Sequence, residues 1–161
     1  MSENNESIRP KIEDEINDSQ MDDLLKKNAL DFVAYLRANG MTTDANHSKA
    51  FKYMDKFVCI LDIYPVDNIV GWTIIDSPIC TSEYNDFPLD EHLKEFAWEH
   101  VTNCVNCGCG NRPGTQKILG KEFDNVCTYF VVFRNPDAET LQKVIQLIEV
   151  LKHYIDENVN K

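Results

Sequence analysis

The fold is decided by residues 57–75, which read FVCILDIYPVDNIVGWTII. Both ends of this stretch are rich in β-branched and aromatic side chains, and the PVDN in its middle contains residues that favour a turn. We therefore predict two antiparallel strands, 57–64 and 69–75, on either side of a turn at 65–68. Residues 49–54 alternate between apolar and polar side chains and predict a strand before them, although so short a segment also fits a helical turn. Together the three strands would form an antiparallel meander.

Three helices are predicted around this meander. The first covers residues 20–39, between a capping signal and the stop signal Asn39-Gly40. The second begins near Pro88, and its apolar face would continue to Cys104. The third begins at Asn135-Pro136 and keeps its apolar positions in helical register to its end. These positions are Leu141, Val144, Ile145, Ile148, Leu151 and Ile155.

Residues 117–119 and 126–133 predict two further strands, separated at Gly120. The sequence thus predicts an α+β fold in which an antiparallel sheet of four to five strands, a meander plus a hairpin, packs against three helices. This fold would form one domain over residues 19–161. Residues 1–18 are rich in Ser, Asn, Glu and Asp without hydrophobic periodicity, and we expect them to be a flexible acidic tail.

Size and charge restrict the function classes. The chain has 161 residues, 43% of them hydrophobic and 27% charged, which is typical of one globular domain. No apolar run approaches the ~18–20 residues that cross a bilayer, and the polar, acidic N-terminus does not have the pattern of a secretory signal peptide. The net charge of −11 includes eight acidic against two basic side chains in residues 1–23. We therefore expect a cytoplasmic protein that binds neither nucleic acid nor anionic membranes, and whose cysteines stay reduced.

Cysteines concentrate in residues 96–127, which hold four of the six in the chain. Residues 104–108 read CVNCG, a spacing that lets two thiolates point at one metal ion, with a glycine that frees the backbone to turn. Cys109 adds a third thiol, and Cys127 would reach the same point if its strand passes beneath the loop. His100 would lie one helical turn earlier, on the same helix face. A tetrahedral zinc site takes four ligands, and the sequence leaves open which four of five bind. The five candidates are Cys104, Cys107, Cys109, Cys127 and His100.

Other interpretations of these residues stay open. Cys104 or Cys107 could act as a reactive thiol in a redox protein or an enzyme, although the pair follows a helix C-terminus, where the helix dipole disfavours a thiolate. Alternatively the cysteines are structural, and a metal-free domain binds a basic protein partner through its acidic surface. His100 could be a hydrogen-bonded core residue rather than a ligand. Cys59 alternates with apolar neighbours in a predicted strand, and we expect it to be buried.

Two segments resemble small, uncharacterised cysteine-containing α+β domains. They are residues 120–127, GKEFDNVC, followed by NPDAE at 135–139, and residues 87–92, FPLDEH, ahead of Ala97-Trp98. The resemblance covers about the last two thirds of the chain. It implies no catalytic residue, because no activity is established for such domains. From the residues themselves we expect a small intracellular binding or regulatory module, rather than an enzyme, with a structural zinc ion at its cysteine cluster.

Overall fold

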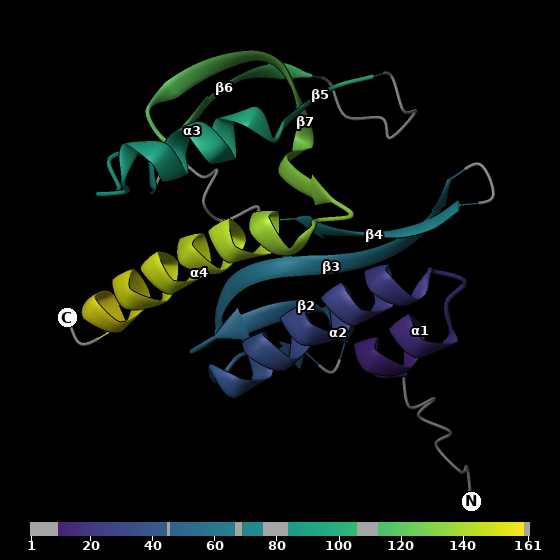
Figure 1. The fold of residues 1–161 in the computed structure, drawn as a ribbon. Coiled ribbons are helices and arrows are strands. Elements are labelled where there is room, and N and C mark those ends of the chain that lie inside the picture. Colours follow the sequence, from purple (N-terminus) through teal and green to yellow (C-terminus); the bar gives the residue numbers. More distant parts are fainter. Residues whose placement is uncertain (1–9, 45, 67–68, 76–83, 106–112, 160–161) are drawn as a thin grey trace, which may run out of the picture.

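The structure is a computed structural model, and it describes residues 10–44, 46–66, 69–75, 84–105 and 113–159. Over these residues the chain forms four helices and seven strands (Figure 1). The helices are α1 (Ile12–Asp18), α2 (Asp23–Ala38), α3 (Glu91–Glu99) and α4 (Ala138–Val159). The strands are β1 (Thr42–Asp44), β2 (His47–Tyr53), β3 (Lys56–Val66), β4 (Ile69–Ile75), β5 (Val101–Asn103), β6 (Gly114–Ile118) and β7 (Lys121–Arg134).

The seven described strands form one antiparallel sheet in the order β1-β2-β3-β4-β7-β5, with β6 also paired to β7. Strand β7 belongs to both parts of this sheet because its two ends have different partners. Its first residues pair with β6, where Ile118 lies opposite Lys121, and its last residues pair with β4, where Thr73 lies opposite Arg134. Figure 1 shows β7 curving from the upper part of the molecule to the lower part. This one strand therefore joins the meander to the hairpin.

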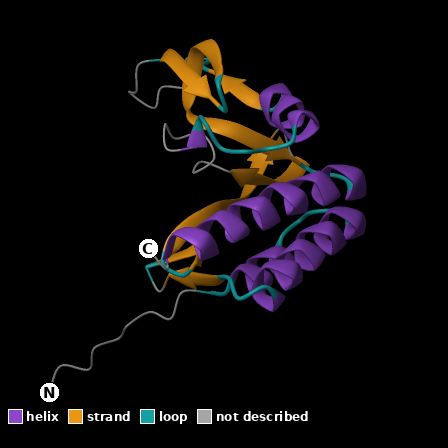
Figure 2. Ribbon diagram, turned by 90° about the vertical axis from the view of Figure 1, so that its left-hand side faces the viewer, coloured by secondary structure: helices purple, strands orange, loops and turns teal. Residues whose placement is uncertain are grey.

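Helices α1, α2 and α4 cover one face of the meander formed by β1 to β4 (Figure 2). Helix α2 buries Phe32, whose ring centroid lies 6.1 Å from that of Trp72 in β4. Helix α4 buries a stripe of residues at helical spacing, among them Val144, Ile148 and Leu151. Because burying one large apolar side chain is worth about 1.5–3 kcal/mol, this interior holds the helices on the sheet.

Helix α3 packs with β5, β6 and β7 into a smaller unit in the upper part of Figure 1. The ring of Phe96 in α3 stacks on Phe133 in β7, with the centroids 5.3 Å apart. The indole Nε1 of Trp98 donates a 2.8 Å hydrogen bond to the carbonyl oxygen of Ile118 at the end of β6. These contacts fix the C-terminal end of α3 over the sheet, close to the point where β7 leads into α4.

The predicted sheet of four to five strands on three helices is wrong, because the described residues contain seven strands and four helices. Strand β1 lies within residues 41–48, a polar segment that reads as a loop. It is a short edge strand of three polar residues, only one of which is exposed, so it contains no apolar run that would predict a strand. Strand β5 lies within the expected second helix, where pairing with β7 supplies the backbone hydrogen bonds that a helix would otherwise make.

The predicted flexible tail is also wrong for residues 12–18, which form helix α1. Ile12 and Ile16 are 0% and 1% exposed, four residues apart on one face of this helix. Arg37 of α2 binds the Glu13 carboxylate through Nε and through Nη2, the latter at 3.0 Å. These bonds hold the pKa of Glu13 below its usual value. Residues 1–9 lie outside the described part of the chain.

Several individual elements are confirmed. Strands β3 and β4 form the predicted antiparallel pair, in continuous register from Ile60 opposite Ile75 to Val66 opposite Ile69, although β3 extends two residues into the predicted turn. Helix α2 is also present, but it begins three residues later than predicted: Ser19 ends α1, and Asp22 is the N-cap, whose carboxylate accepts a 2.8 Å hydrogen bond from the backbone N–H of Leu25. The apolar stripe of α4 and the burial of Cys59 are also as expected.

Candidate functional site

The structure separates His100 from Cys104. Helix α3 ends at Glu99, His100 is its C-cap, and the chain continues as the extended strand β5. Four extended steps span about 13 Å, against about 6 Å for four residues along a helix. The prediction that His100 and Cys104 lie one above the other on a helix face is therefore wrong. Val101 and Thr102 are β-branched, which favours the strand that the structure forms here.

Cys104 lies beside the strand that carries Cys127. Its backbone N–H donates a 2.8 Å hydrogen bond to the carbonyl oxygen of Asn125, and the Asn125 side-chain amide donates a 3.2 Å bond back to the Cys104 carbonyl. Asn125 has a φ of 56°, a left-handed conformation that asparagine tolerates well. Both cysteines are partly exposed, and both are free thiols. Cys104 and Asn125, which are 21 positions apart in the chain, are thus paired at this point.

The remaining cysteine candidates, Cys107 and Cys109, lie outside the described residues. Within the described residues no group of three or more His, Cys, Asp and Glu side chains is placed to hold a metal ion. The structure therefore brings the Cys104 and Cys127 segments together and moves His100 away from Cys104. The zinc site itself stays a prediction.

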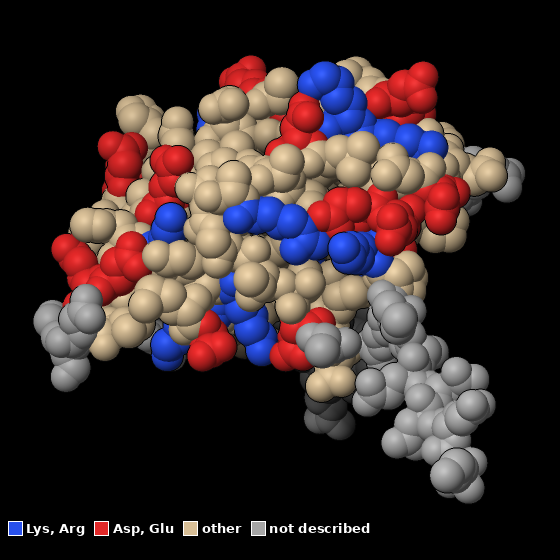
Figure 3. All heavy atoms as spheres, turned by 90° about the horizontal axis from the view of Figure 1, so that it is seen from below, with Lys and Arg blue, Asp and Glu red and all other residues tan. Residues whose placement is uncertain are grey.

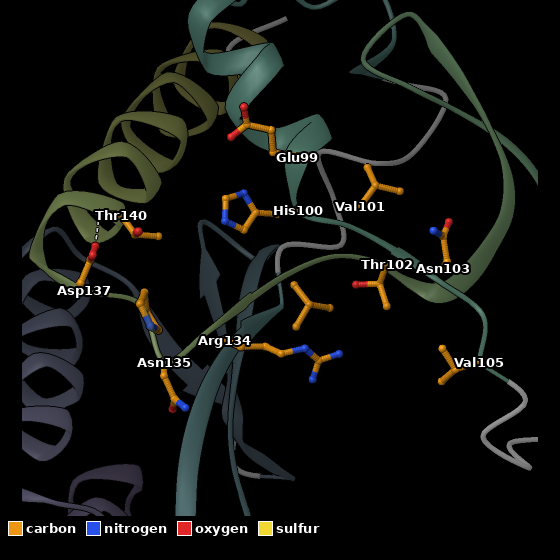
Figure 4. A pocket seen from close by; sticks show the side chains of 12 residues that line it. Glu99, His100, Val101, Thr102, Asn103, Val105, Arg134, Asn135, Asp137 and Thr140 are labelled. Carbon is orange, nitrogen blue, oxygen red and sulfur yellow. Dashed lines mark hydrogen bonds between the residues drawn. The ribbon is translucent and has the colours of Figure 1, made fainter. Parts of the chain in front are cut away.

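His100 instead borders a pocket of about 590 Å³ between the end of α3, strand β5 and the junction of β7 with α4 (Figure 4). Its Nδ1 lies 2.8 Å from the carbonyl oxygen of Phe96. The imidazole packs against the edge of the stacked pair of phenyl rings, 4.8 Å from the Phe96 centroid and 4.7 Å from the Phe133 centroid. Because a carbonyl oxygen only accepts, Nδ1 carries the hydrogen in this contact, and Nε2 of the neutral ring is left as an acceptor.

Polar groups from three elements surround the imidazole, as Figure 4 shows. Glu99 lies on one side of His100 and Arg134 on the other, while Thr140 and Asp137 project from the first turn of α4. Apolar side chains and the polar side chains of β5 complete the wall of the pocket. The further lining residues are Val101, Thr102, Asn103, Val105, Val132, Asn135 and Pro136.

Asn135 fixes the turn from β7 into α4 beside this pocket. Its Oδ1 accepts a 2.9 Å hydrogen bond from the backbone N–H of Trp72, and its own N–H donates a 2.8 Å bond to the Trp72 carbonyl. Its φ is 44°, and its amide lies against Gly71, where a Cβ atom would come within 2.5 Å of Oδ1. Arg134 and Asp137, on either side of Asn135, are therefore held in place by β4.

Asp137 is occupied by the helix that it begins. Its carboxylate accepts a 2.8 Å hydrogen bond from the backbone N–H of Thr140, the bond that caps α4. Hydrogen bonding from Thr140 is the main reason that the pKa of Asp137 lies below its usual value. The predicted cap at Asn135 is thus two residues early, and Asn135 pairs with Trp72 instead.

The sequence contains little signal for this pocket. Glu99 reads as a solvated helix charge, and Arg134 and Thr140 belong to no motif. Only the NPD at residues 135–137 marks a structured position, and it marks a helix start rather than a site. The pocket arises because the end of α3 meets the start of α4, 35 or more residues later in the chain.

Charges on the face seen in Figure 3 alternate in sign. Among the described residues, ion pairs join Lys49 to both Glu15 and Asp62, and Lys52 to Asp44. This face therefore presents no uninterrupted acidic surface, in spite of the net charge of −11. None of the described helices combines the length and the apolar character needed to span a bilayer.

Comparison with models of known protein families, with curated proteins and with solved structures finds no match to this chain. The chemistry of the two candidate sites is consequently inferred from the residues that form them.

Proposed function

We propose that this chain is a small cytoplasmic binding module in which a zinc ion joins β5 to β7. The ligands would be Cys104 and Cys127 together with Cys107 and Cys109. His100 is left out of this set because the strand that follows it carries it away from Cys104. Thiolate ligands require reduced cysteines, which fits a reducing compartment.

The observation that carries this proposal is the pairing of Cys104 with Asn125 through two hydrogen bonds. Cys127 lies two residues along β7 from Asn125, and both Cys104 and Cys127 have a free and partly exposed thiol. A C-x-x-C-G loop that starts at one of the two paired strands has the spacing that zinc ligands use. An ion bound there would fasten the loop to β7 and stabilise the smaller unit directly, because structural zinc contributes to folding.

The test is the zinc content of the full, untagged chain, measured by elemental analysis. We expect one zinc per chain, and a lower melting temperature after the metal is removed with a chelator. Cys104→Ser and Cys127→Ser should each lose zinc. The matched control is Cys59→Ala, which removes a buried thiol from β3 and should lower stability while the zinc content stays the same.

Protein without zinc whose melting temperature does not respond to added zinc would refute the proposal. Such a protein with one rapidly alkylated thiol at Cys104 would favour the thiol-enzyme interpretation instead.

A further inference from the structure

The sheet formed by β1 to β4 and the end of β7 has two unlike faces. On one face Leu61, Ile74 and Phe133 lie opposite one another on neighbouring strands, and each is at most 2% exposed. Helices α1, α2 and α4 cover this face, and Figure 2 shows no described helix on the other face. The side chains of the second face are therefore open to a partner.

This open face carries a row of apolar side chains. Residues that pair directly across strands point to the same face, and four such residues are Ala50 on β2, Ile60 on β3, Ile75 on β4 and Val132 on β7. The three larger ones are only half-buried, and none of them packs against the core that the described residues form. Ile69, which is 68% exposed, lies on the same face at the start of β4. Apolar surface of this kind is typical of a protein–protein contact.

A charged row runs beside the apolar row. Asp62, Thr73 and Arg134 lie opposite one another, two residues along β3, β4 and β7 from the apolar row and thus on the same face. Lys49 binds Oδ1 of Asp62 at 3.0 Å, and a carboxylate can accept from a second cation. Arg134 is exposed and forms no ion pair with another described residue, and in Figure 4 it points away from α4. The row is therefore negative at one end and positive at the other, with Thr73 between them.

We propose that the open face binds a second copy of this chain in a symmetric dimer. The two-fold axis would run parallel to β4 between the two sheets, over Thr73. Asp62 and Arg134 lie one strand, about 4.8 Å, to either side of that axis, so Asp62 of each copy would face Arg134 of the other. The same rotation places Ile75 on Ile75 and Ile60 on Val132, which gives the aligned packing of two sheets. The face is thus complementary to itself in both charge and polarity, and the proposed zinc site takes no part in it.

The charge of the chain favours this partner over others. A net charge of −11 makes two copies repel one another unless the contact surface is itself balanced. The charges of Asp62 and Arg134 cancel, and Lys52, which is on the same face near β1, is paired with Asp44. A basic partner would meet Arg134 and the apolar row here instead of an excess of acids, so this face does not suit it.

The first test is the mass of the full chain in solution, by sedimentation equilibrium and light scattering. We expect a reversible dimer of two 18.6 kDa chains with a Kd below about 100 μM. A mass of one chain at every concentration up to about 300 μM would overturn the proposal, because the face would then have another occupant.

Charge reversal tests the orientation of the two copies. Arg134→Glu and Asp62→Arg would each bring like charges face to face at both ends of the row, and each should raise the Kd at least ~10-fold. Asp62→Arg also reduces the net negative charge, so its effect cannot come from overall repulsion. The double variant restores opposite charges and should return the Kd to within about threefold of wild type. Both side chains are well exposed, so these variants should fold.

Two more variants separate this face from the rest of the surface. Lys117→Glu makes the same change of charge as Arg134→Glu at an exposed cation on β6, and it should leave the Kd unchanged. Ile60→Thr keeps a β-branched side chain but shortens the apolar row, and it should raise the Kd at least ~10-fold while the far-UV circular dichroism stays the same. A dimer that keeps its Kd in both Arg134→Glu and Ile60→Thr, or a double charge variant that does not recover, would also overturn the proposal.

Discussion

Substitution of Gly71 by alanine tests how β4 positions the start of α4. A Cβ atom at residue 71 would lie 2.5, 2.9 and 3.1 Å from the Oδ1, Nδ2 and Cγ atoms of Asn135. Real Cβ atoms do not approach other heavy atoms so closely, so the Asn135 amide has to move. Its hydrogen bond to the backbone N–H of Trp72 would then break, and Trp72 is only 1% exposed.

The magnitude follows from two costs. Overpacking a filled site costs about 1–3 kcal/mol, and leaving a buried N–H unpaired costs about 1–3 kcal/mol. The two share one displacement, so we expect a total loss of about 2–3 kcal/mol in the free energy of unfolding. The backbone of Gly71 is not in the left-handed region, so alanine would otherwise be neutral or slightly stabilising at this strand position.

The assay is chemical denaturation of four proteins: wild type, Gly71→Ala, Asn135→Gly and the double variant. Glycine at residue 135 keeps the left-handed backbone and removes the amide that the new Cβ would strike. In that background Gly71→Ala should cost nothing, which gives a coupling energy of about 2 kcal/mol or more. For a chain of this length the single variant should melt about 4–12 °C below wild type.

A Gly71→Ala protein as stable as wild type would refute this reasoning, because the clash would then not exist. Additive costs in the double variant would refute it as well, since they would place the loss elsewhere than at Asn135.

Two further predictions concern α1. Ile16→Ala should lower the free energy of unfolding by about 2–5 kcal/mol, because Ile16 is 1% exposed. The control is Asp14→Ala, which replaces an exposed side chain of the same helix and should cost under about 1 kcal/mol. Equal effects of the two substitutions in chemical denaturation would mean that α1 is not packed on the protein. Glu13→Gln should destabilise the protein most at neutral pH. The hydrogen bond from Arg37 lowers the pKa of Glu13 in the folded protein from its usual value of 4.5. The stabilisation that the ionised Glu13 provides is therefore complete above pH 4.5 and is lost as the pH falls through the lower, folded-state pKa. A stability difference between wild type and this variant that stays constant from about pH 6 to pH 3 would contradict this assignment.

Strong periodicity explains which elements could be predicted from the sequence. The stripe of α4 repeats along the whole helix, and residues 57–75 combine two β-rich runs with a turn, so the strands β3 and β4 follow from local pattern. Helix α1 does not follow in this way, because its seven residues carry only two apolar side chains, Ile12 and Ile16, too few to establish a period. Their burial depends on α2 and the sheet beside them.

The candidate sites likewise combine features that follow from local patterns with features that depend on contacts between distant segments. The cysteine spacing near residues 104–109 is local, and by itself it predicts a metal site. The pairing of Cys104 with Asn125 is not local, and it replaces the expected helix with a strand. His100 consequently lies away from Cys104, in a pocket where only Asn135, Pro136 and Asp137 belong to a recognisable pattern, and that pattern marks a helix start.

The sequence alone determined the meander, the long C-terminal helix and the concentration of thiols, because each follows from a pattern of residues that are neighbours in the chain. Tertiary structure decided where α3 ends, which segments the long strand β7 brings together and which side chains surround His100. The physical reason is that β pairing satisfies backbone hydrogen bonds between distant segments. Its gain therefore depends on partners that a local pattern does not contain.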